Sequence, residues 1–192
     1  MSSKKFFIIG LSGTTNSGKS TLTSMLQSAF PHAFTMCQDS YFYGPDDPRV
    51  PLESQGFQNW ECLGAMDMEK MVAHVNSWMA KQESNKTPAL LIIEGFLIFN
   101  HRQLSSLFDQ KYFIKVDYST SAKRRVFRTY VPPDVPGYFE SVVWPKYLQN
   151  LEDIQDQTQI EYLDGSKSLD DLYNQLVQGI KAVLSGDKKN NS

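Results

Sequence analysis

The stretch Gly13-Thr14-Thr15-Asn16-Ser17-Gly18-Lys19-Ser20 carries the strongest structural signal in this chain. It matches the phosphate-binding pattern G-x-x-x-x-G-K-[ST] at every fixed position. Its two glycines permit backbone angles that turn successive N–H groups inward around an anion, and a helix that begins here adds its positive end. Lys19 can then reach the β and γ phosphates, and the hydroxyl of Ser20 can bind Mg²⁺. The sequence therefore predicts an ATP site from Gly13 to Thr21, with Mg²⁺ beside it.

The residues on either side place this motif between a strand and a helix. The apolar run at 6–11 is typical of a buried strand and is too short to span a bilayer. After the motif, apolar residues recur at helical spacing until Pro31 ends the pattern. These residues are Leu22, Met25, Leu26, Ala29 and Phe30. A chance match would rarely fall in this context, so we interpret the motif as a P-loop.

Strands and helices alternate along the rest of the chain. Prolines and glycines predict a long irregular segment at 43–64. Apolar runs predict further strands at 33–37, 89–93, 112–116 and 159–163, and amphipathic spacing predicts helices at 68–79, about 142–154 and 169–184. This alternation predicts an α/β fold, a doubly wound, mainly parallel, five-stranded sheet with helices on both faces. Ligands then bind at the carboxyl ends of the strands.

Composition narrows the class of protein. The 192 residues, 41% of them hydrophobic, fit a single domain over 1–192 with a polar tail at about 186–192. Nineteen basic against 21 acidic residues give a net charge of −2, which argues against nucleic acid or a membrane surface as a partner. Cys37 and Cys62 have neither metal-type nor redox-type spacing, which favours reduced thiols in a cytoplasmic protein. The oligomeric state stays open, and a monomer fits the sequence.

Two acidic residues follow predicted strands and should reach the same edge as the P-loop. Asp39 comes after the second strand, where it could accept a proton from an acceptor hydroxyl and join the Mg²⁺ shell through water. A turn or cap is the alternative role for an isolated Asp at this position. Glu94 ends the most apolar strand, where a carboxylate is costly without a partner. We interpret it as a contact to Mg²⁺ or to the hydroxyl, with a helix cap as the alternative.

A basic segment supplies candidate cations for the transferred phosphoryl group. Arg124, Arg125 and Arg128 stand at i, i+1 and i+4, so Arg124 and Arg128 are predicted to share one helix face. Arginines on a lid over the phosphates would oppose the negative charge that develops during transfer. The prolines that follow suit the base of such a lid, which we place at about 123–140. A solvated charged face is the alternative.

Other classes of P-loop protein fit the sequence less well. A GTPase needs a guanine-reading N-K-x-D element, which the sequence lacks, and the D-x-x-G match at 134–137 lies between prolines without a preceding buried strand. A nucleotide-binding scaffold that has lost catalysis is opposed by the intact Lys19, Ser20 and Asp39. A small-molecule kinase fits best, because it needs an acid near the acceptor hydroxyl, Mg²⁺ and mobile cations.

Together with further short stretches, these motifs give a specific family resemblance. The chain resembles the nicotinamide riboside kinases, within the uridine kinase-like group of P-loop kinases, over about 5–184. Besides the P-loop, the matching stretches are Gln38-Asp39-Ser40-Tyr41-Phe42, Met68-Glu69-Lys70-Met71, Leu91-Ile92-Ile93-Glu94-Gly95-Phe96, Lys123-Arg124-Arg125, Arg128, Pro132-Pro133-Asp134, Pro136-Gly137-Tyr138-Phe139, Trp144-Pro145 and Tyr162-Leu163-Asp164-Gly165. This set is far more specific than the P-loop alone.

The resemblance implies a reaction and a set of site residues. ATP would phosphorylate nicotinamide riboside to nicotinamide mononucleotide, a step toward NAD. Asp39 would be the base at the ribose 5′-hydroxyl, with Lys19 and Arg124 acting on the phosphoryl group. Mg²⁺ would be held by Ser20, Asp39 and Glu94, and the two ring hydroxyls of the ribose by Glu61 and Arg128. ATP would also contact Arg124, Phe127, Pro132, Gly165, Ser166 and Lys167, and the nucleoside would contact Asp39, Ser40, Tyr41, Phe42, Trp60, Pro133 and Asp134.

The physics of the substrate agrees with this resemblance. Nicotinamide riboside carries a cationic ring, and a good contact between a cation and an aromatic face such as Phe42 or Trp60 is worth roughly 0.5–2 kcal/mol. Core packing is the alternative for both rings. Glu61 and Ser40 stand where the family carries Asp, so a uridine or cytidine kinase stays open as an alternative. Nicotinic acid riboside, which shares the ribose and the ring, is a further candidate acceptor.

Overall fold

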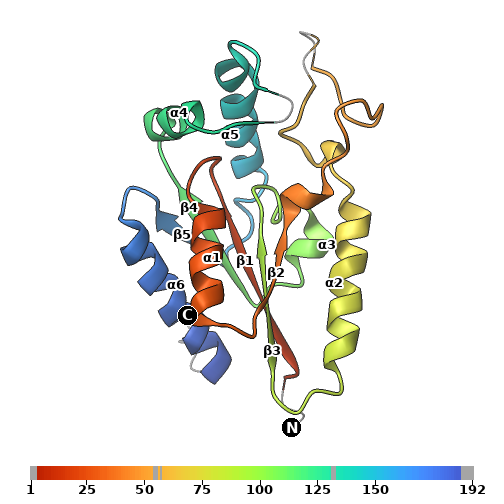
Figure 1. Ribbon diagram of the computed structural model, residues 1–192, viewed down its shortest axis with the longest axis vertical. Coiled ribbons are helices and arrows are strands. Elements are labelled where there is room, and N and C mark those ends of the chain that lie inside the picture. The colour runs from red at the N-terminus through yellow and green to blue at the C-terminus, as the bar shows by residue number, and fades with distance from the viewer. Residues whose placement is uncertain (1–3, 54–55, 57, 131–132, 187–192) are drawn as a thin grey trace.

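The computed structural model describes residues 4–53, 56, 58–130 and 133–186. Five strands form one parallel sheet in the order β2-β3-β1-β4-β5, with helices on both faces (Figure 1). The strands are β1 (Phe6–Gly13), β2 (Phe34–Cys37), β3 (Ala89–Glu94), β4 (Gln110–Lys115) and β5 (Ile160–Asp164). The predicted doubly wound sheet is confirmed, and each strand lies close to its predicted position.

Helices connect the strands and cover the sheet. The α-helices are α1 (Lys19–Ala29), α2 (Met68–Gln82), α3 (Arg102–Ser105), α4 (Tyr118–Val126), α5 (Trp144–Glu152) and α6 (Leu169–Ser185). Two 3-10 turns, η1 (Gln38–Tyr41) and η2 (Leu63–Ala65), flank the irregular segment, and a π-helical turn, η3 (Phe139–Val143), leads into α5. Side-chain caps define where the two longest helices begin, because Asp67 and Ser168 each accept a backbone N–H in the first turn.

Side chains along β1 alternate between two hydrophobic cores, one on each face of the sheet. Ile8 belongs to the core under α2, together with Met71. Ile9 belongs to the core under α1 and α6, together with Leu22 and Ile180. Figure 1 shows α1 beside α6 and α2 on the other side of the molecule. Burial on both faces explains why the central strands read as unbroken apolar runs.

The predicted helix at about 142–154 begins earlier than expected and in another form. Its first turn is η3, in which Phe139, Val142 and Val143 are buried in a third, smaller core. The regular helix α5 then runs from Trp144 to Glu152. Packing of these apolar side chains therefore extends the helical region toward the N-terminus.

The prediction that Arg124 and Arg128 share a helix face is wrong. The helix α4 ends at Val126, and Arg128 lies beyond its end. The side chains of Val126 and Phe127 are 81% and 89% exposed, so no packing stabilises a further turn there. The two arginines therefore approach the P-loop from different parts of the backbone.

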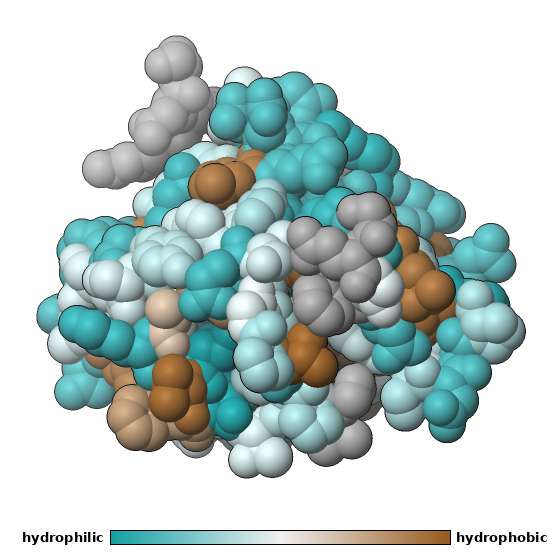
Figure 2. All heavy atoms as spheres, turned by 90° about the horizontal axis from the view of Figure 1, so that it is seen from above, coloured by the Kyte–Doolittle hydropathy of each residue, from teal (hydrophilic) through white to brown (hydrophobic). Residues whose placement is uncertain are grey.

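The carboxyl ends of the parallel strands meet at one edge of the sheet, which faces upward in Figure 1. There β1 runs into the P-loop, β2 leads to Asp39, and β3 ends at Glu94. The helices α4 and α5 and the segment after β2 rise above this edge. Figure 2 looks onto this end of the molecule, whose surface is mostly hydrophilic with a few separate hydrophobic patches. Within the described residues, no helix combines the length and apolarity needed to cross a bilayer.

Candidate active site

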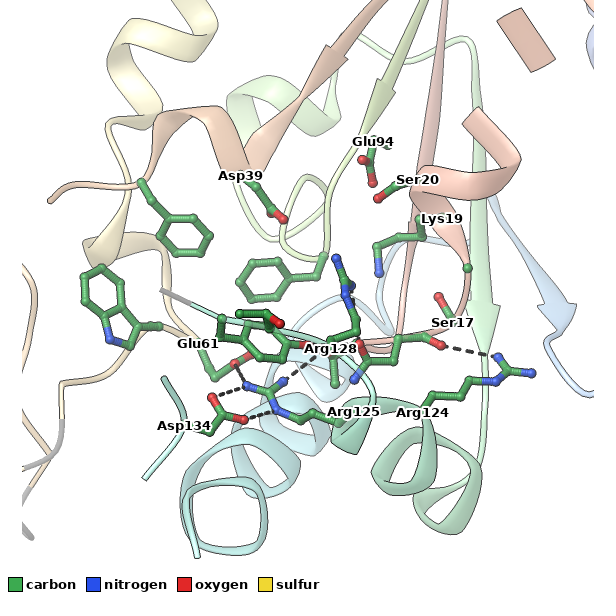
Figure 3. Close-up of a pocket in the computed structure, with 18 of the residues that line it drawn as sticks. Ser17, Lys19, Ser20, Asp39, Glu61, Glu94, Arg124, Arg125, Arg128 and Asp134 are labelled. Atoms are coloured by element: carbon green, nitrogen blue, oxygen red, sulfur yellow. Dashed lines mark hydrogen bonds and ion pairs between the residues drawn. The ribbon is translucent and has the colours of Figure 1, made fainter. Parts of the chain in front are cut away.

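A cavity of about 700 Å³ opens above this edge. Its walls come from parts of the chain that are far apart in the sequence: the P-loop, the ends of β2 and β3, the irregular segment, and α4 with the segment after it. Figure 3 shows a P-loop end with Lys19, Ser20 and Glu94, and an ion-pair end with Glu61, Arg125 and Asp134. The cavity thus brings two different chemical environments together.

The P-loop is shaped by close backbone packing. Gly13 lies against β4, where an added Cβ atom would come within 2.3 Å of the Ile114 carbonyl oxygen. Gly18 precedes α1 with φ of 96°, and no described side chain caps the first helical N–H groups. These N–H groups and the helix dipole therefore suit an anionic ligand. Lys19 Nζ donates to the carbonyl oxygens of Gly13 and Thr14 at 3.1 and 2.9 Å.

Two buried polar atoms of the P-loop, Ser17 Oγ and Asn16 Nδ2, have no hydrogen-bond partner among the described residues. Both residues line the cavity. Because buried polar groups normally have partners, Ser17 Oγ and Asn16 Nδ2 are the donors that a bound polyphosphate would be expected to satisfy.

Lys19 lies in the same part of the cavity. Burial lowers the pKa of Lys19, while the carboxylates of Glu94 and Asp39 act in the opposite direction.

Asp39 and Glu94 bring two carboxylates to neighbouring strand ends. Cys37 is paired with Glu94 across β2 and β3, and its Sγ donates to Glu94 Oε1 at 3.2 Å. The pKa of Asp39 is raised, first because the surrounding protein removes water from the carboxyl group, and second because Glu94 is close. Lys19 and Arg128 oppose this shift in the pKa of Asp39. Burial and the same two carboxylates raise the pKa of the Cys37 thiol to about 12, so it stays protonated and can donate.

The backbone that presents Asp39 is fixed by its buried neighbour Gln38. The side-chain Oε1 of Gln38 accepts the backbone N–H of Leu97 at 2.9 Å. Gly95 makes this approach feasible, because an added Cβ atom there would lie 2.4 Å from Gln38 Cβ. Gln38 therefore ties η1 to the loop after β3 and keeps Asp39 near Glu94.

The ion-pair end is built around the buried guanidinium of Arg125. Its Nε and Nη2 donate to the two carboxylate oxygens of Asp134 at 2.5 and 3.0 Å. Its Nη1 donates to Thr15 Oγ1 of the P-loop at 3.2 Å, and its Nη2 lies 3.8 Å from Glu61 Oε1. Burial raises the pKa of Glu61 to about 7, although the charge of Arg125 acts in the opposite direction. One arginine thus connects the P-loop, the irregular segment and the segment after α4.

Aromatic rings form one wall of the cavity. Phe42 packs edge-on against Trp60, with 5.9 Å between ring centroids, and stacks with Phe96 at 6.1 Å. Tyr138 Oη accepts the backbone N–H of Trp60 at 3.2 Å and donates to the Gln58 carbonyl at 3.0 Å. Such a wall suits a flat ring, and a cationic ring gains an additional attraction to the aromatic faces.

Comparison with known proteins assigns the chain to a family. No protein-family model matches the sequence. Human nicotinamide riboside kinase 1 is 39% identical, and the alignment covers 96% of this chain and 96% of that protein. The chain belongs to the nicotinamide riboside kinase family. Mouse nicotinamide riboside kinase 2 is 36% identical, with 92% of this chain and 96% of that protein covered.

A solved structure supports the fold of this family member. A gluconokinase from Sinorhizobium meliloti has a TM-score of 0.56 at 15% identity, and the match covers 95% of this chain and 96% of that one. At this identity the likeness concerns the fold alone. It agrees with the parallel sheet and P-loop described above.

Most of the site residues predicted for a nicotinamide riboside kinase line the cavity. They are Thr15, Asn16, Ser17, Gly18, Lys19, Ser20, Thr21, Asp39, Phe42, Trp60, Glu61, Glu94, Arg124, Arg128 and Asp134. Nine others lie outside its lining, namely Gly13, Thr14, Ser40, Tyr41, Phe127, Pro133, Gly165, Ser166 and Lys167. Pro132 lies outside the described residues.

Local structure explains why several predicted residues stand apart from the cavity. The η1 turn directs Tyr41 toward α2, where its Oη lies 2.9 Å from His74 Nδ1. Phe127 is almost fully exposed beyond the end of α4. Gly165 packs at the end of β4, where its N–H donates to the Lys115 carbonyl at 2.7 Å. The predicted ligand contacts of these residues therefore lack support from the cavity geometry.

The cavity also contains residues that the sequence analysis did not assign to the site. They are Tyr43, Pro45, Phe96, Arg125, Thr129, Tyr130 and Tyr138. Arg125 was predicted only as part of a basic run, because nothing in the local sequence indicates burial beside Glu61. Phe96 could have been found, since it follows Glu94 at the carboxyl edge where ligands bind.

The P-loop end offers a donor set that fits Mg²⁺. Ser20, Asp39 and Glu94 contribute one hydroxyl and two carboxylates around the cavity. Among the described residues, no group of three or more His, Cys, Asp or Glu side chains is arranged to hold a metal by itself. Mg²⁺ is commonly held by one or two carboxylates together with water and substrate phosphates, and the residues present fit that mode.

Proposed function

We propose that this protein transfers the γ-phosphoryl group of ATP to the ribose 5′-hydroxyl of nicotinamide riboside, giving nicotinamide mononucleotide and ADP for NAD synthesis. The observation that carries the proposal is one cavity with a P-loop end and an ion-pair end, joined by an aromatic wall. Phosphate groups suit the first end, and a ribose with a flat cationic ring suits the second. Membership of the nicotinamide riboside kinase family supports the same acceptor.

At the P-loop end, the triphosphate of ATP would replace hydrogen-bond partners that the protein itself supplies. Phosphate oxygens would accept the N–H groups at the start of α1 and satisfy Ser17 Oγ. Lys19 would exchange the P-loop carbonyls for the β and γ phosphates. Ser20, Asp39 and Glu94 would hold Mg²⁺, which when bound supplies positive charge against the transferred group. Arg124, whose Nη1 donates to the Asn16 carbonyl at 3.3 Å, would add a further cation.

Asp39 is the proposed base. As the bond forms between the ribose 5′ oxygen and the γ-phosphorus, Asp39 would accept the hydroxyl proton. The bond between that phosphorus and the β–γ bridging oxygen breaks, and ADP leaves with the electron pair. The raised pKa of Asp39 favours this role, because a base works best when its pKa approaches the working pH.

At the ion-pair end, we propose that Glu61 and Arg125 bind the ribose diol. Glu61 can accept both ring hydroxyls, and the Arg125 guanidinium beside it can donate to them. This assignment uses Arg125 in place of Arg128, because Arg125 is the arginine that lies next to Glu61. The nicotinamide ring would then lie against Phe42 and Trp60.

We further propose that the chain acts as a single domain, with small molecules as its partners, in the cytoplasm. The proposal for location is supported by the two cysteines, which are free thiols in the structure. The single-domain proposal is supported by one continuous sheet that contributes residues to one cavity.

Product analysis tests the proposed function. Purified protein with Mg²⁺, ATP and nicotinamide riboside should yield a compound with the mass and chromatographic position of nicotinamide mononucleotide. Lys19→Met should abolish its formation, whereas Lys70→Met, which removes an exposed lysine on α2, should leave it unchanged. ATP consumption without this product, or no consumption by the wild-type protein, would overturn the proposal.

A further inference from the structure

We propose that Tyr130 is a positioning residue that holds Arg125 and Arg128 in their orientations over the cavity by bonding to Asn16 of the P-loop. This inference rests on the proposed function, because Arg125 is proposed to bind the ribose diol and Arg128 is directed toward the P-loop end, where the phosphates would bind. Tyr130 lines the cavity and is the last residue of the arginine segment, which we define as residues 124–130.

Three contacts of Tyr130 carry the inference. Its Oη donates to Asn16 Oδ1 at 2.9 Å. The guanidinium carbon of Arg125 lies 4.3 Å from the centroid of its ring, and that of Arg128 lies 5.6 Å away. The ring therefore offers an aromatic face to both cations, and the hydrogen bond from the hydroxyl to Asn16 fixes the position of the ring.

Besides its hydrogen bond to Thr15 Oγ1, Arg125 is held by a carboxylate and by an aromatic ring. Asp134 binds its Nε and Nη2 in a bidentate manner, and the Tyr130 ring contacts the guanidinium. Bidentate binding fixes the plane of a guanidinium, and contact with an aromatic face limits rotation out of that plane. Arg125 Nη2 is thereby kept beside Glu61.

Arg128 depends on Tyr130 more strongly. Its side chain is exposed and makes a hydrogen bond of 3.3 Å to the same Asn16 Oδ1 that accepts from Tyr130. Figure 3 shows its guanidinium directed toward the P-loop end, near Lys19. Arg128 lines the same cavity as Lys19 and Asp39, and its charge acts to lower the pKa of both residues.

Asn16 is suited to receive these donors. It is 9% exposed and has a left-handed backbone with φ of 60°, a conformation that Asn tolerates better than most residues. The backbone carbonyl oxygen of Asn16 also accepts a hydrogen bond from Arg124 Nη1 at 3.3 Å. One P-loop residue therefore receives hydrogen bonds from three side chains of the arginine segment, and Tyr130 supplies the shortest of them.

A double-mutant cycle separates positioning from packing. Tyr130→Phe keeps the ring and removes the hydroxyl, and Asn16→Gly removes the acceptor while permitting the same backbone angle. Mg²⁺–ATP binding, measured by calorimetry, needs no acceptor nucleoside. We expect Tyr130→Phe to weaken that binding about fivefold in the wild-type background and to have no further effect in the Asn16→Gly background. Tyr118→Phe, which alters an exposed tyrosine on α4, is the matched control and should bind ATP normally.

Phosphoryl transfer tests the role of the ring. Tyr130→Leu should raise the KM for nicotinamide riboside at least about threefold above that of Tyr130→Phe, because Arg125 loses the nearer of its two aromatic contacts and keeps only the Phe139 ring at 5.8 Å. Equal KM values for the two variants, an unchanged ATP affinity in Tyr130→Phe, or the same loss in both Asn16 backgrounds would overturn the inference. If the wild-type protein does not phosphorylate nicotinamide riboside, the proposed function fails, while the ATP-binding cycle still decides the role of Tyr130. Thermal unfolding of each variant identifies any loss that comes from misfolding.

Discussion

The P-loop end and the ion-pair end of the cavity are built in opposite ways. The P-loop end comes largely from consecutive residues, Gly13 to Thr21, whose shape depends on backbone angles and on packing against β4. The ion-pair end joins Thr15, Glu61, Arg125 and Asp134 through side chains that meet only in the folded chain. Binding of the phosphates is therefore largely a local property of the sequence, whereas recognition of the acceptor is a property of the tertiary structure.

This contrast has a consequence for how substitutions should act. A change at the P-loop end should affect transfer to every acceptor, because all acceptors share the phosphoryl donor. A change at the ion-pair end should discriminate between acceptors or alter the fold, because its residues support one another. Four substitutions test this distinction, in order of decreasing expected effect.

Asp39→Asn should have the largest effect. We expect turnover to fall at least about a hundredfold for any acceptor, because the amide cannot accept the hydroxyl proton. ATP affinity, measured by calorimetry, should change little. Asp46→Asn, an exposed change in the following segment, should leave turnover unaffected. Near-normal turnover in Asp39→Asn would remove Asp39 from the role of base.

Arg125→Met should have the next largest effect, on stability and on the acceptor together. Removing one partner of a buried ion pair typically costs about 3–5 kcal/mol, because the remaining carboxylates lose their counter-charge. Chemical denaturation should show this loss, and Lys123→Met, which removes an exposed lysine on the same helix, should not. A folded Arg125→Met protein with the normal KM for the riboside would show that Arg125 does not bind the acceptor.

Glu61 should make acceptor binding depend on pH. With a pKa of about 7, Glu61 loses its charge as the pH falls, and the neutral acid accepts hydroxyl hydrogen bonds less strongly. The charged fraction falls about tenfold from pH 8 to pH 6, so we expect the KM for the riboside to rise by up to that factor. In Glu61→Gln the KM should be flat over this range, and Glu69→Gln on the exposed face of α2 should behave as the wild type. A flat profile in the wild-type enzyme would contradict the role of Glu61.

Trp60→Ala should have the smallest effect and the most selective one. Because Trp60 is half-exposed, loss of its aromatic face should raise the KM for nicotinamide riboside by only roughly 2- to 5-fold. The KM for uridine should rise less, because uridine carries no charge on its base. Leu52→Ala, an exposed change in the same segment, is the control. Equal increases for both nucleosides would mean that Trp60 packs against the acceptor without recognising its charge.

Much of the fold could be predicted because its signals are local. Apolar runs marked the buried strands, helical spacing marked α1, α2 and α6, and the P-loop pattern fixed where β1 ends. Strand alternation then placed Asp39 and Glu94 at one edge. The end of α4 was missed. The spacing of the arginines suggested a helix that continues through Arg128, whereas α4 ends at Val126, where the side chains are exposed and do not pack.

The ion-pair end could be predicted only in part. Glu61 was identified through family resemblance, but its partner Arg125 lies 64 positions away and stands in one short run with Arg124 and Arg128, so nothing in the sequence selected it. Tyr41 shows the opposite error. Its place in a matching motif suggested a contact with the nucleoside, but the η1 turn directs its side chain toward His74. Side-chain direction in short turns and pairing over long separations require the tertiary structure.

A competition between two acceptors tests whether the protein selects nicotinamide riboside. Equal concentrations of nicotinamide riboside and uridine, supplied together with limiting Mg²⁺–ATP, give the ratio of the two kcat/KM values from the product ratio. We predict that nicotinamide mononucleotide is the dominant product and that Trp60→Ala shifts the ratio toward uridine monophosphate. Dominant formation of uridine monophosphate by the wild-type protein would keep the phosphoryl chemistry and contradict the proposed acceptor.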